Sequence, residues 1–219
     1  MSTFPGSPRL LKGGLVLLDP TTGVVQRIIT LQYNPDTLTR TLQVQAAETG
    51  NRDRSEALRI KGPPVETFKL DAEIDAADQL EFPDQNPNAA QYGINPQLAA
   101  LETIIYPTSG QLLAANSLAQ AGTLEIAPME APLTVFVWSK SRVVPVRITD
   151  FSITEEAFDV ALNPIRAKVS LGMRVLSVDD LGFGDVGGNL FMVYQQQKER
   201  LAAFGGGGTF GDLGIPGVS

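Results

Sequence analysis

Alternating apolar and polar positions predict β-strands near the start of the chain. Aliphatic residues dominate 14–18 and 24–32, and the segment between them, 19–23, reads Asp-Pro-Thr-Thr-Gly. Proline fixes one backbone dihedral angle and glycine permits a positive φ, so this segment predicts a turn and the two runs predict a hairpin. Residues 39–45 alternate as a half-buried strand does, and we expect this third strand to pair with the hairpin.

The clearest alternation lies in residues 66–75, where apolar and charged side chains occupy successive positions. Because successive side chains of a strand point to opposite faces, one face is predicted to be core and the other wet. This pattern is typical of an antiparallel sheet that is covered on one face. The apolar positions are Phe68, Leu70, Ala72 and Ile74, and the charged positions are Lys69, Asp71, Glu73 and Asp75.

The middle of the chain changes to a helical period. The pair Asn95-Pro96 is typical of an N-cap followed by proline in the first turn, and apolar residues then recur at helical spacing until Tyr106-Pro107. We expect a helix of about a dozen residues here and a weaker helical piece over 109–121. Residues 133–138 return to strand, and a final β region, 143–178, is broken by a turn around Asn163-Pro164.

These patterns predict two parts of the chain, and a mainly β fold with helices (α+β). Residues 1–180 form a β domain with a helical insert at about 95–121. Residues 181–219 form a Gly-rich linker, a helix over 189–204 and a Gly-rich tail that we expect to be flexible. The polar, charged stretch 46–61 is predicted to be a solvated loop, with an arm that orders on contact as the alternative.

Composition narrows the chemistry sharply, because the chain contains no Cys and no His. Disulfides, thiolate nucleophiles, zinc clusters and His-based catalytic triads made by this chain alone are thereby excluded. Seventeen basic against 24 acidic residues give a net charge of −7, the wrong sign for neutralising phosphates. We therefore expect no nucleic-acid partner and no membrane insertion, since the apolar runs are also far too short to span a bilayer.

The glycines at 182, 184 and 187 match the dinucleotide spacing G-x-G-x-x-G between a predicted strand and a predicted helix. That site also needs a second parallel strand after the helix, with an acidic residue near its end. Here the helix runs into the Gly-rich tail instead. The glycines are therefore interpreted as a linker, and we expect no cofactor.

The acidic residues Asp71, Glu73 and Asp75, with Asp78 beyond them, follow one side of the predicted strand 66–75. Paired carboxylates can serve acid–base catalysis or bind a hard metal ion. A solvated strand face explains the same pattern, because nothing in the sequence makes this face concave or dry. A charged surface between subunits, or around a lumen, is the next interpretation. An enzyme that depends on carboxylates or a metal is a remote alternative, and we expect no catalytic residues and no metal.

Two segments resemble a known family. Residues 31–40, with an aromatic-Asn-Pro triplet followed by an aliphatic residue and an arginine, resemble a signature of the tube and baseplate adaptor proteins of phage-tail-like contractile injection systems. Residues 146–159 and 162–171 are similar to the paired strands that close the same domain. The positions that carry the resemblance are Tyr33, Asn34, Pro35, Leu38, Arg40, Glu155, Phe158, Asn163, Pro164 and Arg166.

The resemblance covers about residues 10–178 and implies a phage tail-tube-like antiparallel β-barrel or sandwich with a flanking helix and a C-terminal helix. It implies a non-enzymatic structural adaptor that forms a homohexameric ring between the baseplate hub or spike protein and the inner tube. Baseplate wedge or sheath subunits would be further partners. Many members carry a C-terminal LysM module, which has no counterpart in these residues, so its contacts are not carried over.

The same resemblance leaves one alternative within the machine, the inner tube subunit itself. Such subunits are usually shorter and lack the central helical insert and the tail. The resemblance also implies assembly in the cytoplasm as part of a phage-tail-like particle, whether or not the particle is later released.

Overall fold

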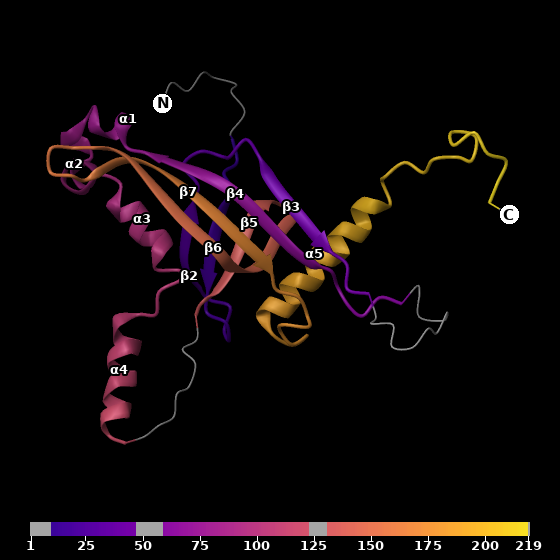
Figure 1. Ribbon diagram of the computed structural model, residues 1–219, viewed down its shortest axis with the longest axis horizontal. Coiled ribbons are helices and arrows are strands. Elements are labelled where there is room, and N and C mark those ends of the chain that lie inside the picture. Colours follow the sequence, from indigo (N-terminus) through magenta and orange to yellow (C-terminus); the bar gives the residue numbers. More distant parts are fainter. Residues whose placement is uncertain (1–9, 47–58, 123–130, 219) are drawn as a thin grey trace.

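The computed structural model describes residues 10–46, 59–122 and 131–218, whose strands form one seven-stranded antiparallel sheet (Figure 1). The strand order is β2-β1-β5-β6-β7-β4-β3, and every pairing between neighbours is antiparallel. The predicted α+β class is confirmed. The strands are β1 (Gly14–Leu18), β2 (Val25–Thr30), β3 (Leu38–Gln43), β4 (Val65–Asp75), β5 (Leu133–Ser139), β6 (Arg142–Phe158) and β7 (Pro164–Val175).

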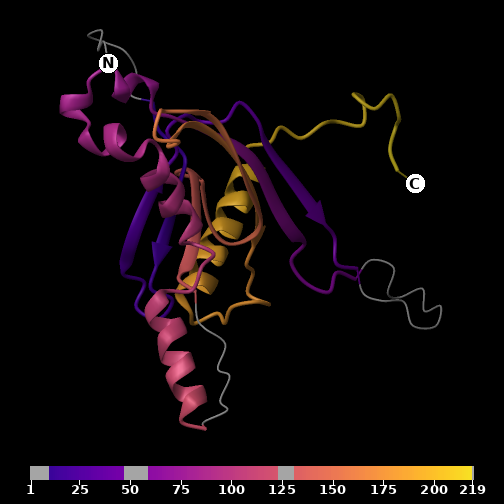
Figure 2. The ribbon, with the colours of Figure 1, turned by 60° about the vertical axis from the view of Figure 1, so that its left-hand side comes forward.

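The sheet bends around a single apolar core. In Figure 2 the indigo strands β1 and β2 lie on the left and the violet strands β3 and β4 on the right. Side chains from both sides belong to the same buried cluster, in which Phe68 of β4 stacks at a tilt on Phe136 of β5 with ring centroids 5.5 Å apart. The predicted alternation of β4 is confirmed, because Phe68, Leu70, Ala72 and Ile74 are all buried.

Helices cover the openings that the curved sheet leaves. Helix α3 buries Leu98 and Leu101, and α5 buries Phe191 and Tyr194, whereas α4 buries none of its side chains. The α-helices are α1 (Ala77–Leu80), α2 (Pro87–Tyr92), α3 (Asn95–Glu102), α4 (Ser109–Gln120) and α5 (Val186–Ala202), with a 3₁₀ turn at Pro83–Gln85.

The expected barrel or sandwich is not what the described residues form, because β2 and β3 are the two free ends of one open sheet. The side chain of Gln32 bridges part of the gap to β4. Its Nε2 donates to the Asp75 carbonyl oxygen at 2.6 Å, and its Oε1 accepts from the Asp75 N–H at 2.9 Å. A side-chain amide and helix α3 thus occupy the place where a closed barrel would have a strand ladder.

The third predicted strand has a different partner from the one expected. Strand β3 pairs with β4, with Leu38 opposite Leu70, and lies at the far end of the sheet from the β1–β2 hairpin. Alternation reports which side of a strand is buried, but it carries no information about the neighbouring strand. The expectation that β3 joins the hairpin is therefore wrong.

Most other elements lie where the pattern placed them, with shifted ends. Helix α3 ends at Glu102, earlier than expected, and its N-cap is Ile94 rather than Asn95. Helix α5 starts at Val186 instead of 189. The hairpin of β6 and β7 confirms the expected strands, and α4 lies where the second helical piece was expected. The helical region starts at Ala77, earlier than the expected insert at about 95–121, because α1 and α2 were not predicted. The expected loop at 46–61 falls largely on residues 47–58, which lie outside the described part of the chain.

Gly93 joins α2 to α3 at a place where only glycine fits. Its φ is +59°, and a Cβ built there would lie 2.2 Å from the Pro164 carbonyl oxygen, which itself accepts the Ile94 N–H at 2.9 Å. L-residues with side chains avoid this backbone region. The close approach lets the β6–β7 turn hold the start of α3.

We expect Gly93→Ala to lower the free energy of unfolding by about 1 to 3 kcal/mol, because it adds backbone strain and a clash with a backbone oxygen. Urea denaturation measures this. Gly110→Ala is the matched control, because nothing lies within 4 Å of a Cβ at Gly110 in α4. An unchanged stability of Gly93→Ala would contradict this account of the junction.

Candidate functional site

The two segments that carry the family resemblance meet at Asp75, the last residue of β4. Its carboxylate Oδ2 accepts a hydrogen bond from Nε of Arg166 at 2.7 Å and forms an ion pair with Nη2 of the same side chain at 2.7 Å. Its Oδ1 accepts the Ala77 N–H at 2.7 Å. Its backbone is held by Gln32, next to Tyr33. Asp75 therefore joins the segment before β3 to the start of β7.

Hydrogen bonding decides the protonation of this carboxyl. Partial burial alone would raise the pKa of Asp75, but the Ala77 N–H and the Arg166 guanidinium outweigh that effect and hold the pKa below its usual value. The folded state thus favours the charged form of Asp75.

Within the first segment, the side chain of Asn34 forms two hydrogen bonds to the backbone. Its Oδ1 accepts the Gly13 N–H at 2.9 Å, and its Nδ2 donates to the Leu11 carbonyl oxygen at 2.8 Å. The side chain thus ties the segment before β1 to the connection after β2. Pro35 and Leu38 are half-buried, whereas the ring of Tyr33 is exposed.

Within the second segment, Asn163 organises the turn between β6 and β7. It bonds to the Asp159 carboxylate through its N–H at 2.8 Å and its Nδ2 at 2.9 Å, and Nδ2 also donates to the Gln91 carbonyl oxygen at 3.2 Å. Pro164 is buried, whereas Glu155 and Phe158 are exposed. The turn is thereby fastened to helix α2.

The acidic residues of β4 do not form an acidic surface by themselves. Strand β7 lies between β6 and β4, so Arg166 stands between Glu156 and Asp75, and Lys168 stands opposite Glu73. Ser170 donates to Asp71. On this outer face, acidic side chains of β4 and β6 therefore lie beside basic side chains of β7. That the face lines a lumen or a subunit interface stays a prediction. Among the residues that the structure describes, no three acidic side chains gather as metal ligands would.

Sequence reasoning missed the buried carboxylate of Glu66. This residue is 2% exposed, and its side chain accepts the Tyr194 hydroxyl at 2.8 Å and the Lys198 ammonium at 2.7 Å. The Arg40 Nε lies 3.7 Å away. Burial, and then the neighbouring carboxylate, raise the pKa of the Tyr194 hydroxyl. The sequence did contain a signal for this burial. Residues two apart in a strand lie on the same face, so Glu66 falls on the face of β4 that carries the buried Phe68.

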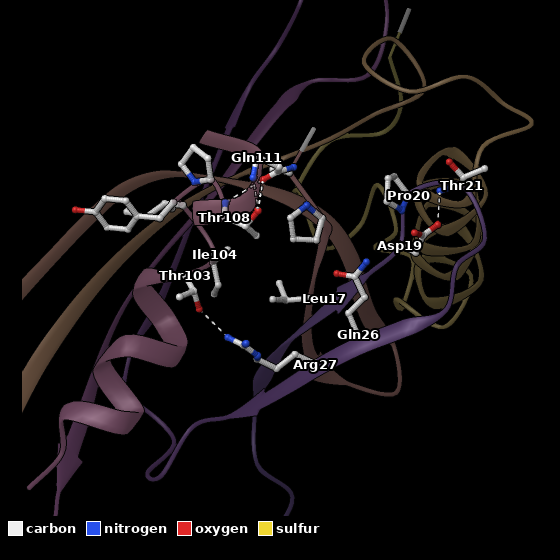
Figure 3. A pocket seen from close by; sticks show the side chains of 15 residues that line it. Leu17, Asp19, Pro20, Thr21, Gln26, Arg27, Thr103, Ile104, Thr108 and Gln111 are labelled. Carbon is white, nitrogen blue, oxygen red and sulfur yellow. Dashed lines mark hydrogen bonds between the residues drawn. The ribbon is translucent and has the colours of Figure 1, made fainter. Parts of the chain in front are cut away.

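A groove of about 670 Å³ opens beside the start of β2 (Figure 3). Arg27 donates from Nη1 to the Thr103 hydroxyl at 2.7 Å, and Asp19 accepts from the Thr21 and Thr22 N–H groups, so the chain itself already bonds both charges. At its rim, Thr108 and Gln111 form the capping box that starts α4. The apolar lining includes Leu17, Pro20, Ile104, Ile105, Tyr106 and Pro132.

Comparison with known proteins adds no family to this picture, since neither a scan against protein-family models nor a search of curated proteins finds a match. No helix in the described part of the chain is long and apolar enough to cross a membrane. The site therefore has to be interpreted from its own geometry.

We expect Glu66→Gln to lower the free energy of unfolding by about 1 to 3 kcal/mol, because a neutral amide no longer balances the Lys198 ammonium in a buried place. Chemical denaturation, followed by circular dichroism, measures the change. Glu199→Gln is the control on the exposed side of α5. Equal stability of the two variants would show that Glu66 does not hold α5.

We also expect Asp75→Asn to lose about 1 kcal/mol of stability at neutral pH. Because the folded pKa of Asp75 lies below the unfolded one, its contribution is complete above the unfolded pKa of about 3.9 and disappears as pH falls through the folded pKa. The difference between parent and variant should therefore shrink on acidification below about pH 4. A difference that stays constant down to pH 2 would refute this.

Proposed function

We propose that this protein is a structural adaptor whose copies join into a ring between the hub of a baseplate and the inner tube of a contractile injection system. One observation carries the proposal. The single sheet ends in two different free edges, β2 on one side and β3 on the other, each six residues long and largely exposed. Free edges present unpaired N–H and C=O groups that another strand can satisfy.

The two edges differ from each other, so pairing between copies is head to tail. Such a heterologous contact generates a closed ring when the rotation between copies closes. The result is a continuous wall in which each sheet extends the next. The resemblance of residues 31–40 and 146–171 to the adaptor family supplies the number of copies, six, and the partners on either side.

No described feature favours catalysis over this role. The carboxylates of the outer face lie beside cations or hydroxyls, as with Asp75 and Arg166, and the buried Glu66 is held by Tyr194 and Lys198. These arrangements stabilise the fold. The inner tube subunit remains the second candidate, because free edges serve a polymerising tube equally well.

The test is the mass of assemblies in solution, measured by light scattering and negative-stain microscopy. The chain is examined alone over a range of concentrations, and then with hub and tube proteins encoded by neighbouring genes. For an adaptor we expect one ring per hub and tube growth from that ring. Long tubes from the chain alone would instead identify the tube subunit. A chain that stays monomeric throughout would overturn both.

A further inference from the structure

Both ends of the sheet carry apolar surface that none of the described residues covers. At the end of β3, Leu42, Val44 and Ile60 are exposed, with Val44 at 70%. Ile60 lies close to this end because it forms a bridge with Ala46, which extends the β3–β4 ladder. We call these three residues the ribbon end. It is rich in β-branched and aliphatic side chains, which strands favour when they pair.

The opposite end of the sheet carries the groove beside β2 and, next to it, helix α4. Residues 109–120 contain no charged side chain, and none of them is buried. Leu112, Leu113 and Leu118 are exposed. Helices of this length are marginal alone in water, and α4 has uncharged polar residues but no charged side chain to favour solvent exposure of its leucines. The base of α4 lines the groove through Gln111.

The groove borders the start of β2 and extends over Leu17 of β1 and Pro132 before β5. Near its C-terminal end, β2 faces α3 and β4 across a slot of about 170 Å³ that includes Ile29, Leu31 and Ile74. Near its start, Gln26 and Arg27 line the groove instead. A strand added to β2 is therefore expected to pair mainly beside the groove.

The direction of pairing decides what enters the groove. All six pairings in the sheet are antiparallel. If β3 of one copy adds antiparallel to β2 of the next, the end of β3 lies beside the start of β2. This places the ribbon end over the groove. Parallel pairing would instead bring the polar residues Asp36 and Thr37 there.

We propose that the ribbon end of one copy docks in the groove of a neighbouring copy and that this neighbour also covers α4. The inference rests on the proposed ring. Docking would not bury an unpaired charge, because the two charged residues that line the groove, Arg27 and Asp19, are already hydrogen-bonded within the chain. It also explains why the two patches lie at opposite ends of one sheet, as a head-to-tail contact requires.

Cross-linking tests the contact directly, because the chain has no native cysteine. The double variant Val44→Cys, Gln26→Cys is treated with a short bis-maleimide under the conditions in which the chain assembles. We expect a ladder of covalent multimers in denaturing gels, because each copy offers one site to each neighbour. Each single variant should stay monomeric in the same gel.

The outcomes separate the two proposals. Multimers by mass without the ladder would overturn the docking inference and leave the ring intact. Cross-linked dimers of Val44→Cys alone would indicate a symmetric contact and would also overturn it. A chain that is monomeric at every concentration, alone and with its partners, would overturn the ring and the docking together.

A second variant tests the apolar contact without cross-linking. Val44→Asp is expected to weaken association about tenfold or more, because it places a carboxylate in an apolar contact. Val160→Asp is the matched control, since Val160 is fully exposed at the turn after β6 and lies outside both patches. We expect it to change association less than about twofold. Equal effects of the two variants would refute the docking.

Discussion

Burial of one apolar face of a single sheet is the constraint on which the rest of the structure depends. Seven strands cannot hide that face while flat, so the sheet bends and brings β4 towards the β1–β2 hairpin. The remaining gap is spanned by the Gln32 amide, which bonds to both backbone groups of Asp75, and is filled by α3. Asp75 in turn holds Arg166 and thereby fixes the start of β7.

This way of closing the core leaves the sheet edges free. A barrel would pair its first and last strands with each other and would have no edge to offer. Here a side chain and a helix close the core, so β3 and the start of β2 remain available for other chains. The proposed ring and the docking of the ribbon end both follow from this difference. The same logic gives the uncharged helix α4 a place in an assembly.

The buried carboxylate of Glu66 links the C-terminal helix to the edge of the sheet. Tyr194 and Lys198 of α5 and Arg40 of the edge strand β3 surround it. A buried charge costs free energy unless it is paired and hydrogen-bonded. Loss of a partner would therefore leave the Glu66 carboxylate buried with less compensation, so the four side chains are energetically coupled. The position of α5 and the shape of the β3 edge are thus coupled.

The sequence by itself determined the strands and the helices α3, α4 and α5, because the period of apolar residues reports which side chains are buried, but it did not predict the short helices α1 and α2. It also excluded cysteine and histidine chemistry, and it pointed to Asn34, Asn163 and Arg166, whose contacts are structural. Only the tertiary structure decided that β3 pairs with β4 and that Gln32 hydrogen-bonds to Asp75. It also decided that Glu66 is buried against α5, where it accepts hydrogen bonds from that helix. The reason is physical. Periodicity is a local property, whereas the choice of a partner strand or a buried ion pair depends on residues far away in the chain that come together only when the core closes.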